Sequence, residues 1–251
     1  MAIACLALCA LAGRLRFIHD EFPTRGRRVA AAAMLAGILT LAVFYPAAAG
    51  GRLAAGAAEE LWFPGLFAGH GLLVIFLAGW WWLRPTGAPE FLAMGFEQLS
   101  ADVRHGIVVG LAGWFITITV TMAVAAAVFA AGGTAVQPQE IPAVMVWLAG
   151  LSLGHKLLVI GVAMTVEELF FRGFLQQRFG LALSSVLFTL AHAGYGLPFM
   201  MVSVLTISLL IGRALQQRGR LLPCIVAHGV FDAIQLLLIL PWAVRMIERG
   251  A

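Results

Sequence analysis

Two adjacent carboxylates and an arginine lie inside a long apolar stretch of this chain, in the segment Thr165-Val166-Glu167-Glu168-Leu169-Phe170-Phe171-Arg172. Two later clusters share this feature, Phe188-Thr189-Leu190-Ala191-His192 and His228-Gly229-Val230-Phe231-Asp232. Ionisable groups at membrane depth are costly and rare, so they indicate a functional site. Carboxylates and imidazoles are also the usual groups of general acid–base catalysis. The three clusters are therefore candidates for one chemical site.

The composition places the chain in a membrane. Of its 251 residues, 62% are hydrophobic and 11% are charged, whereas an average soluble domain has about 25% charged residues. The length suits one helical bundle and leaves no room for a sizeable soluble domain. The sequence therefore predicts an all-α, polytopic membrane helix bundle with about seven to eight membrane helices. Three cysteines without CxxC spacing indicate neither a disulfide framework nor a zinc knuckle.

Apolar runs outline the membrane helices. They cover roughly residues 29–49, 66–83, 106–131, 142–178, 181–193, 197–216 and 221–243. A span needs about 20 residues, so the run 181–193 is too short to cross. A continuous helix over 142–178 would be about 55 Å long, so we expect a break near Gly150–Lys156. We divide the chain into N-terminal membrane helices (1–141) and a catalytic core (142–243) within a single membrane domain.

The basic residues predict an orientation. If 142–178 crosses once, most arginines fall on one side, which the positive-inside rule makes cytoplasmic. These arginines are Arg14, Arg16, Arg25, Arg27, Arg28, Arg84, Arg104, Arg172, Arg178, Arg213, Arg218 and Arg220. Three arginines fall on the opposite side: Arg52, Arg245 and Arg249. Residues 1–13 are interpreted as a short membrane-associated helix.

Helix lengths place the three polar clusters at a similar depth. Glu167 lies eleven residues before Arg178, which corresponds to about 16 Å from the predicted cytoplasmic end. His192 and Asp232 each lie eleven residues after the start of their apolar runs at Leu181 and Leu221, again about 16 Å. We therefore expect one polar layer, in or near the cytoplasmic half of the membrane.

The spacing within the clusters predicts unequal roles. Glu168 and Arg172 are four residues apart and should face each other as an ion pair. His228 and Asp232 have the same spacing and should share one helix face. Glu167 lies about 100° around the helix from Glu168. We expect it to have no charge partner, which would suit general acid or base work.

The three motifs EExxxR, FxxxH and HxxxD, in this order on successive helices, resemble those of the CAAX-protease and bacteriocin-processing (CPBP) family. The resemblance covers roughly residues 142–243, and characterised members of that family are intramembrane glutamic endopeptidases. It implies that Glu167 and His192 activate the attacking water. It also implies that His228 and Asp232 stabilise the oxyanion of the tetrahedral intermediate.

The remaining motif residues would support the site. By the same resemblance, Glu168 and Arg172 would hold the first helix in place. We expect Phe188 to give packing support. The family commonly has Asn where this chain has Asp232. An ionised carboxylate cannot donate a hydrogen bond, so Asp232 is either protonated or orients His228. The other four histidines, His19, His70, His105 and His155, lie at loops or helix ends, and we assign them no chemistry.

The function implied is that of an intramembrane glutamic-type endopeptidase. It would cleave a peptide bond of a lipidated or membrane-anchored protein or peptide, from a cytoplasm-facing cavity. We expect no metal or cofactor, and no nucleic acid partner; the partners are the substrate and the lipid bilayer. The expected localisation is multi-pass in the cell membrane, and the Ala-, Gly- and Arg-rich composition favours a prokaryotic inner membrane.

Other functions remain open. Glu167, His192 and His228 could form a two-His, one-carboxylate zinc site of a membrane protease, although the chain has no HExxH motif. A membrane scaffold or bacteriocin-immunity protein would keep the bundle without catalysis. Polar residues at mid-depth also occur along ion paths of transporters, but the sequence shows no inverted repeat.

Overall fold

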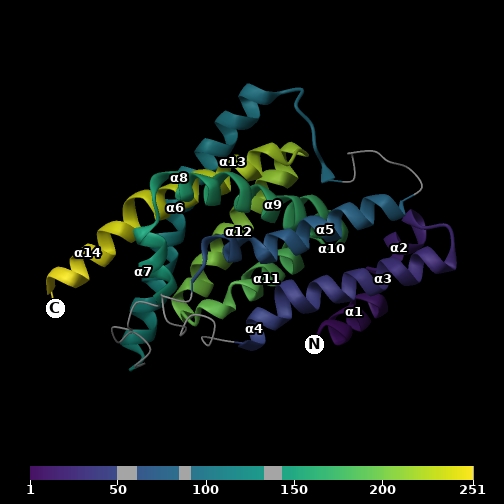
Figure 1. Ribbon diagram of the computed structural model, residues 1–251, viewed down its shortest axis with the longest axis horizontal. Coiled ribbons are helices and arrows are strands. Elements are labelled where there is room, and N and C mark those ends of the chain that lie inside the picture. Colours follow the sequence, from purple (N-terminus) through teal and green to yellow (C-terminus); the bar gives the residue numbers. More distant parts are fainter. Residues whose placement is uncertain (50–60, 85–91, 133–142, 251) are drawn as a thin grey trace.

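The computed structural model describes residues 1–49, 61–84, 92–132 and 143–250, which form helices and no strand (Figure 1). The first part of the chain contains α1 (Ala2–Leu11), α2 (Arg16–Glu21), α3 (Arg25–Leu39), η1 (Thr40–Phe44), α4 (Tyr45–Ala49), η4 (Phe63–Phe67), α5 (Ala68–Leu83) and α6 (Leu99–Ala130). The second part contains α7 (Ala143–Gly150), α8 (Leu153–Leu158), η7 (Val159–Ala163), α9 (Met164–Glu168), η8 (Leu169–Gln176), α10 (Gln177–Phe179), α11 (Leu181–Ala191), η9 (Ala193–Tyr195), α12 (Pro198–Arg218), α13 (Leu222–Ile234), η10 (Gln235–Ile239) and α14 (Leu240–Gly250). The predicted all-α bundle is confirmed for the described ranges.

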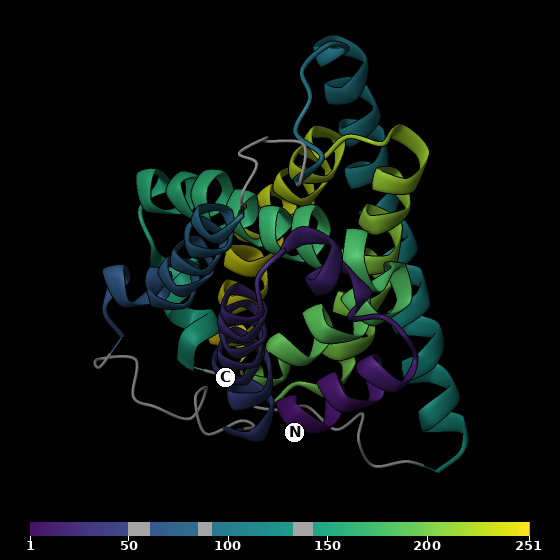
Figure 2. The same cartoon turned by 90° about the vertical axis from the view of Figure 1, so that its right-hand side faces the viewer.

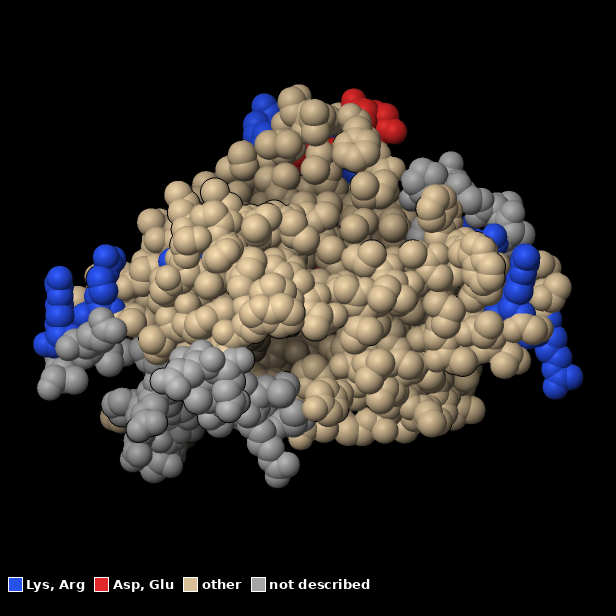
Figure 3. All heavy atoms as spheres, viewed as in Figure 1, with Lys and Arg blue, Asp and Glu red and all other residues tan. Residues whose placement is uncertain are grey.

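The protein is an integral membrane protein with fewer clear spans than expected. Five described helices are long and apolar enough to cross: Arg25–Ala48, Phe63–Leu83, Leu99–Ala130, Pro198–Arg218 and Leu222–Met246. A bent pair, α7 with the helix Leu153–Phe179, gives a sixth if it counts as one span. The count of seven to eight is not confirmed, because α1 and Leu181–Tyr195 are shorter apolar helices. On the face in Figure 3, a broad uncharged area separates charged groups at the edges.

The predicted break in the fourth apolar run is present. α7 and the helix Leu153–Phe179 meet at an angle of 109°. Ser152 begins the new helix, because its hydroxyl accepts a hydrogen bond from the backbone N–H of His155 at 3.3 Å. Serine is a favoured residue at this position because it satisfies a free N–H of the first turn. The helix with the two glutamates therefore starts inside the run.

Helix α6 supports the helix that carries the third motif. It lies along α12 and α13 on one side of the bundle (Figure 2). A Cβ added to Gly110 would lie only 2.7 Å from the carbonyl oxygen of Ala227, so no larger residue fits there without a shift. Because Ala227 directly precedes His228, this close approach fixes the position of that histidine relative to α6.

One apolar core joins the two predicted parts of the chain. The rings of Phe76 and Trp80 on α5 pack edge-to-face against Phe174 on η8, with centroids 5.0 and 4.8 Å apart. Phe170 packs against Phe76 in the same way at 5.5 Å. The first part therefore contacts the motif helix directly. The proposed boundary at 141/142 lies outside the described residues, so the division stays a prediction.

Buried acids bind the arginines at helix ends. Glu21 on α2 forms ion pairs with Arg178 at 2.7 Å and with Arg84 at 3.4 Å. Asp102, fully buried in the first turn of α6, binds two arginines at the junction of α12 and α13, Arg218 at 2.9 Å and Arg220 at 2.6 Å. These pairs tie the ends of α5 and α10, and the α12–α13 junction, to neighbouring elements. We call the part of the bundle that contains Arg84, Arg178, Arg218 and Arg220 the arginine end.

Two of the arginines used to predict the orientation need comment. Arg172 is completely buried, so it does not lie at a helix end, and the side on which the arginines lie stays a prediction. The spacing to Arg178 corresponds to about 9 Å along the helix, which puts Arg172 inside the bundle. Arg52, predicted to lie on the opposite side, is outside the described residues.

Candidate active site

A buried charged network connects the first and third motifs. Arg172 Nε lies 3.2 Å from Glu168 Oε2, and both side chains are fully buried. The ion pair predicted from their spacing is therefore present. Glu168 Oε1 lies 2.9 Å from His228 Nδ1, and Arg172 also donates from Nη2 to the hydroxyl of Ser208 at 3.1 Å. Glu168 thus joins α9 to α13, a contact that the sequence did not predict.

Phe188 lies between the three motifs. Its ring centroid is 4.9 Å from the Arg172 guanidinium carbon, a cation–π arrangement. It is 4.5 Å from the ring of His192 and 5.8 Å from the ring of His228. These contacts agree with the packing role expected for Phe188, because one apolar ring separates and positions the polar groups around it.

The end of α11 fixes the orientation of His192. Its Nδ1 lies 2.9 Å from the backbone carbonyl oxygen of Phe188, one helical turn earlier. A carbonyl oxygen can only accept, so Nδ1 carries the proton and Nε2 of the neutral ring is an acceptor. An imidazole in this form is able to take a proton from water.

The expectation that Glu167 lacks a charge partner is wrong. Its Oε1 lies 3.0 Å from Nε2 of His70 on α5, to which we assigned no chemistry. Glu167 Oε2 has no hydrogen-bond partner among the described residues. One signal could have identified His70: it is an imidazole inside the apolar run 66–83, where an ionisable group is itself unusual.

Glu167 and His192 line the same cavity, which has a volume of about 200 Å³. The lining residues are Leu41, Ala42, Pro46, Gly69, His70, Leu73, Glu167, Phe171, Ala191, His192 and Tyr195. Tyr195, in the short turn after α11, stacks on His192 with ring centroids 6.2 Å apart. The sequence analysis also missed Tyr195. The cavity brings together a carboxylate, two imidazoles and a phenol.

Asp232 lies beside His228, as the spacing predicted. Its Oδ2 is 3.8 Å from His228 Nε2, too long for a hydrogen bond but within ion-pair range. Neither residue is among those that line the 200 Å³ cavity. The structure therefore places Glu167 and His192 on the cavity, whereas His228 contacts Glu168 and has Asp232 beside it.

The described residues contain no preformed ligand set for the zinc site considered above. Within the described ranges, no group of three or more His, Cys, Asp or Glu side chains is arranged to hold a metal ion. Two of the candidate ligands also have other partners: His228 Nδ1 contacts Glu168, and Glu167 Oε1 contacts His70.

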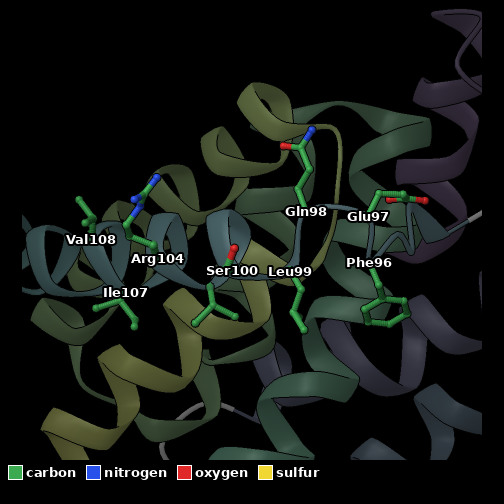
Figure 4. Close-up of a pocket in the computed structure, with 9 residues that line it drawn as sticks. Phe96, Glu97, Gln98, Leu99, Ser100, Arg104, Ile107 and Val108 are labelled. Carbon is green, nitrogen blue, oxygen red and sulfur yellow. The ribbon is translucent and has the colours of Figure 1, made fainter.

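A larger groove, of about 660 Å³, lies along the start of α6 (Figure 4). Of its lining residues, only Glu97 and Arg104 are charged, and none belongs to the three motifs. Its other side chains include Phe96, Leu99, Val103, Ile107 and Val108. An apolar groove without paired acid and base groups is not a candidate for the chemistry described above.

Comparison with known proteins identifies one family. A family model described as type II CAAX prenyl endopeptidase, Rce1-like, matches residues 150–234. This segment contains all three motifs and about a third of the chain. The resemblance to the CPBP family is confirmed for these residues. Neither the curated proteins nor the solved structures contained a match.

Proposed function

Since residues 150–234 carry the pattern of type II CAAX prenyl endopeptidases, we propose that this integral membrane protein is an intramembrane endopeptidase of the glutamic type. The observation that carries this proposal is a shared cavity. The Glu167 carboxylate and the His192 imidazole both line this cavity, which has a volume of about 200 Å³. A membrane scaffold or immunity protein would not need an acid–base pair on such a cavity.

In the proposed reaction, a water activated by Glu167 and His192 attacks the scissile carbonyl carbon and gives a proton to Glu167. His192 presents an unprotonated Nε2, because its Nδ1–H is donated to the Phe188 carbonyl. The proton is then delivered to the leaving nitrogen as the C–N bond breaks. Water supplies both the new hydroxyl and the proton, so no co-reactant is required.

The second part of the proposed machinery stabilises the oxyanion. His228 is held at Nδ1 by Glu168, which is itself held by Arg172. With the Nδ1–H donated to Glu168, Nε2 of His228 is a donor in the imidazolium form, and in that form it would serve a developing negative charge. Asp232, at 3.8 Å from this nitrogen, favours a charged His228 if it is ionised and adds a second donor if it is protonated.

The proposed substrate is a membrane-associated protein or peptide, lipidated or anchored, in the cell membrane of a prokaryote. The matching family is described as CAAX prenyl endopeptidases, so we propose a farnesylated C-terminal peptide as the first substrate to test. We expect Glu167→Gln to bind substrate without cutting it. The variant should therefore enrich, from membranes, a protein that the wild-type chain cleaves in vitro.

The trapping experiment has two controls. Mapping the cut site in the enriched protein should show one internal peptide bond cleaved by wild type and left intact by the variant. Wild-type cleavage should also survive exhaustive chelation. Loss of cleavage on chelation with recovery on adding zinc would instead assign Glu167, His192 and His228 to metal binding.

The orientation predicted from the arginines can be tested by cysteine labelling. The arginine end should be cytoplasmic by the positive-inside rule. In a background without the native cysteines, Arg218→Cys should react only with reagents that reach the cytoplasm. Ala131→Cys, at the far end of the 32-residue helix α6, should react only from outside. Labelling of Arg218→Cys from outside would contradict the predicted orientation.

The same experiment addresses the opening of the cavity. Pro46 lines the cavity, and its distance from Arg28 along α3, η1 and α4 is about 27 Å. The α4 side of the cavity therefore lies nearer the face opposite the arginines. We propose access from that face, in place of the cytoplasmic opening expected from the sequence. Pro46→Cys should label from the same side as Ala131→Cys, and labelling from the cytoplasm would restore the original expectation.

A further inference from the structure

His70 is the one ionisable residue on the cavity that comes from outside the matched segment 150–234. It is near the start of α5, between Gly69 and Gly71, and α5 packs against α9, which carries Glu167. Its side chain is 17% exposed and that of Glu167 is 13% exposed. Ionisable groups are costly to bury at this depth, so two of them in contact indicate a functional role for the pair.

The partners of His70 define where its protons lie. Nδ1 is 3.2 Å from the backbone carbonyl oxygen of Leu66. That oxygen can only accept, so Nδ1 carries a proton. Nε2 is 3.0 Å from Glu167 Oε1, so one further proton lies between these two atoms. With this proton on nitrogen, His70 is an imidazolium, Glu167 is a carboxylate able to act as a base, and the total charge of the pair is zero.

This contact uses only one oxygen of Glu167. Oε1 is bound by His70, whereas Oε2 has no hydrogen-bond partner in the described ranges. A carboxylate held at one oxygen cannot rotate freely, so its other oxygen has a defined position at the cavity. Misplacement of a reacting group by about 1 Å can cost about 10²-fold in rate. By binding Oε1, His70 therefore fixes the position of Oε2, the oxygen of Glu167 that is free to react.

We propose that His70 is the positioning residue of the general base, which binds Glu167 Oε1 and presents Oε2 to the attacking water. The proposal rests on the proposed function, in which Glu167 accepts the proton of water. In that step the water O–H bond breaks, the proton goes to Oε2, and the oxygen bonds to the carbonyl carbon. Oε2 then gives the proton to the leaving nitrogen as the C–N bond breaks, while the hydrogen bond to His70 remains in place.

Two amide variants give a matched test. Glutamine at position 70 places its amide nitrogen near the position of Nε2 and can still donate to Glu167. Asparagine places its nitrogen near Nδ1 and reaches only the Leu66 carbonyl. With a farnesylated C-terminal peptide as the probe, we expect His70→Asn to lower kcat by about 10- to 100-fold with little change in KM. His70→Gln should recover most of this loss.

His155→Ala is the control for loss of a histidine. His155 stacks on Phe63 of η4 at 4.0 Å and does not line the cavity. The variant His155→Ala should therefore leave kcat unchanged. Equal turnover of folded His70→Asn, His70→Gln and wild type would overturn the proposal for His70, even if Glu167→Gln is inactive. Full activity of Glu167→Gln would instead remove the proposed function itself.

A stability cycle tests the contact without any substrate. Melting temperatures are measured for wild type, His70→Asn, Glu167→Ala and the double variant in the same detergent, because alanine at position 167 cannot contact His70. Residues in contact give non-additive effects, and we expect a non-additive shift of about 2–4 °C in Tm. His70→Asn combined with Glu97→Gln, whose carboxylate is exposed at the other groove, should be additive. Additivity in both cycles would overturn the proposed contact.

Discussion

Replacement of Glu167 by glutamine is expected to lower peptidase turnover by about 10²-fold or more while the protein stays folded in the membrane. Glutamine keeps the size of the side chain and can still contact His70, which lies 3.0 Å from Glu167 Oε1. It cannot accept the proton of the attacking water, since an amide has no basic oxygen at neutral pH. The measurement is kcat on the farnesylated peptide, with melting temperature as the check on folding.

The control for this prediction is the same change at another carboxylate. Glu97 is exposed and lies on the groove at the start of α6, away from the cavity. Glu97→Gln should keep wild-type turnover. Wild-type turnover in Glu167→Gln would end the interpretation of this site as a glutamic peptidase, because no other described carboxylate lines the cavity.

The largest loss of stability is expected from Arg172→Met. Arg172 and Glu168 are both fully buried and form an ion pair at 3.2 Å. Removal of one partner of a buried pair leaves an uncompensated charge and typically costs about 3–5 kcal/mol. The free energy of unfolding should fall by this amount, which will also reduce the yield of folded protein. Detergent-solubilised protein analysed by size exclusion and thermal unfolding gives both values.

Two further variants separate charge from size in this prediction. Arg213 is exposed and donates a hydrogen bond to Gln216 Oε1 at 3.0 Å, so Arg213→Met should have little effect. The double variant Glu168→Gln with Arg172→Met removes both charges and retains an amide oxygen that can accept from His228. It should be more stable than Arg172→Met alone. If Arg172→Met is as stable as wild type, the buried pair does not hold the helices together.

The sequence by itself determined the class of the protein and the local geometry of each motif. Hydrophobic runs and scarce charges predicted a helical membrane bundle, because a lipid environment requires every backbone polar group to be satisfied within a helix. The helical repeat predicted that Glu168 would face Arg172 and that His228 would share a face with Asp232, and both pairs are present. Such pairs depend only on residues within one turn of each other.

Only the tertiary structure decided which clusters meet. Glu167 contacts His70, 97 residues earlier in the chain, and Glu168 contacts His228, 60 residues later. The helical period gives the face on which a side chain lies, but not the neighbour that this face meets. That neighbour depends on how α5, α9 and α13 rotate and approach each other, which close contacts such as Gly110 against Ala227 control. His70 therefore became part of the site only when the packing of α5 against α9 was known.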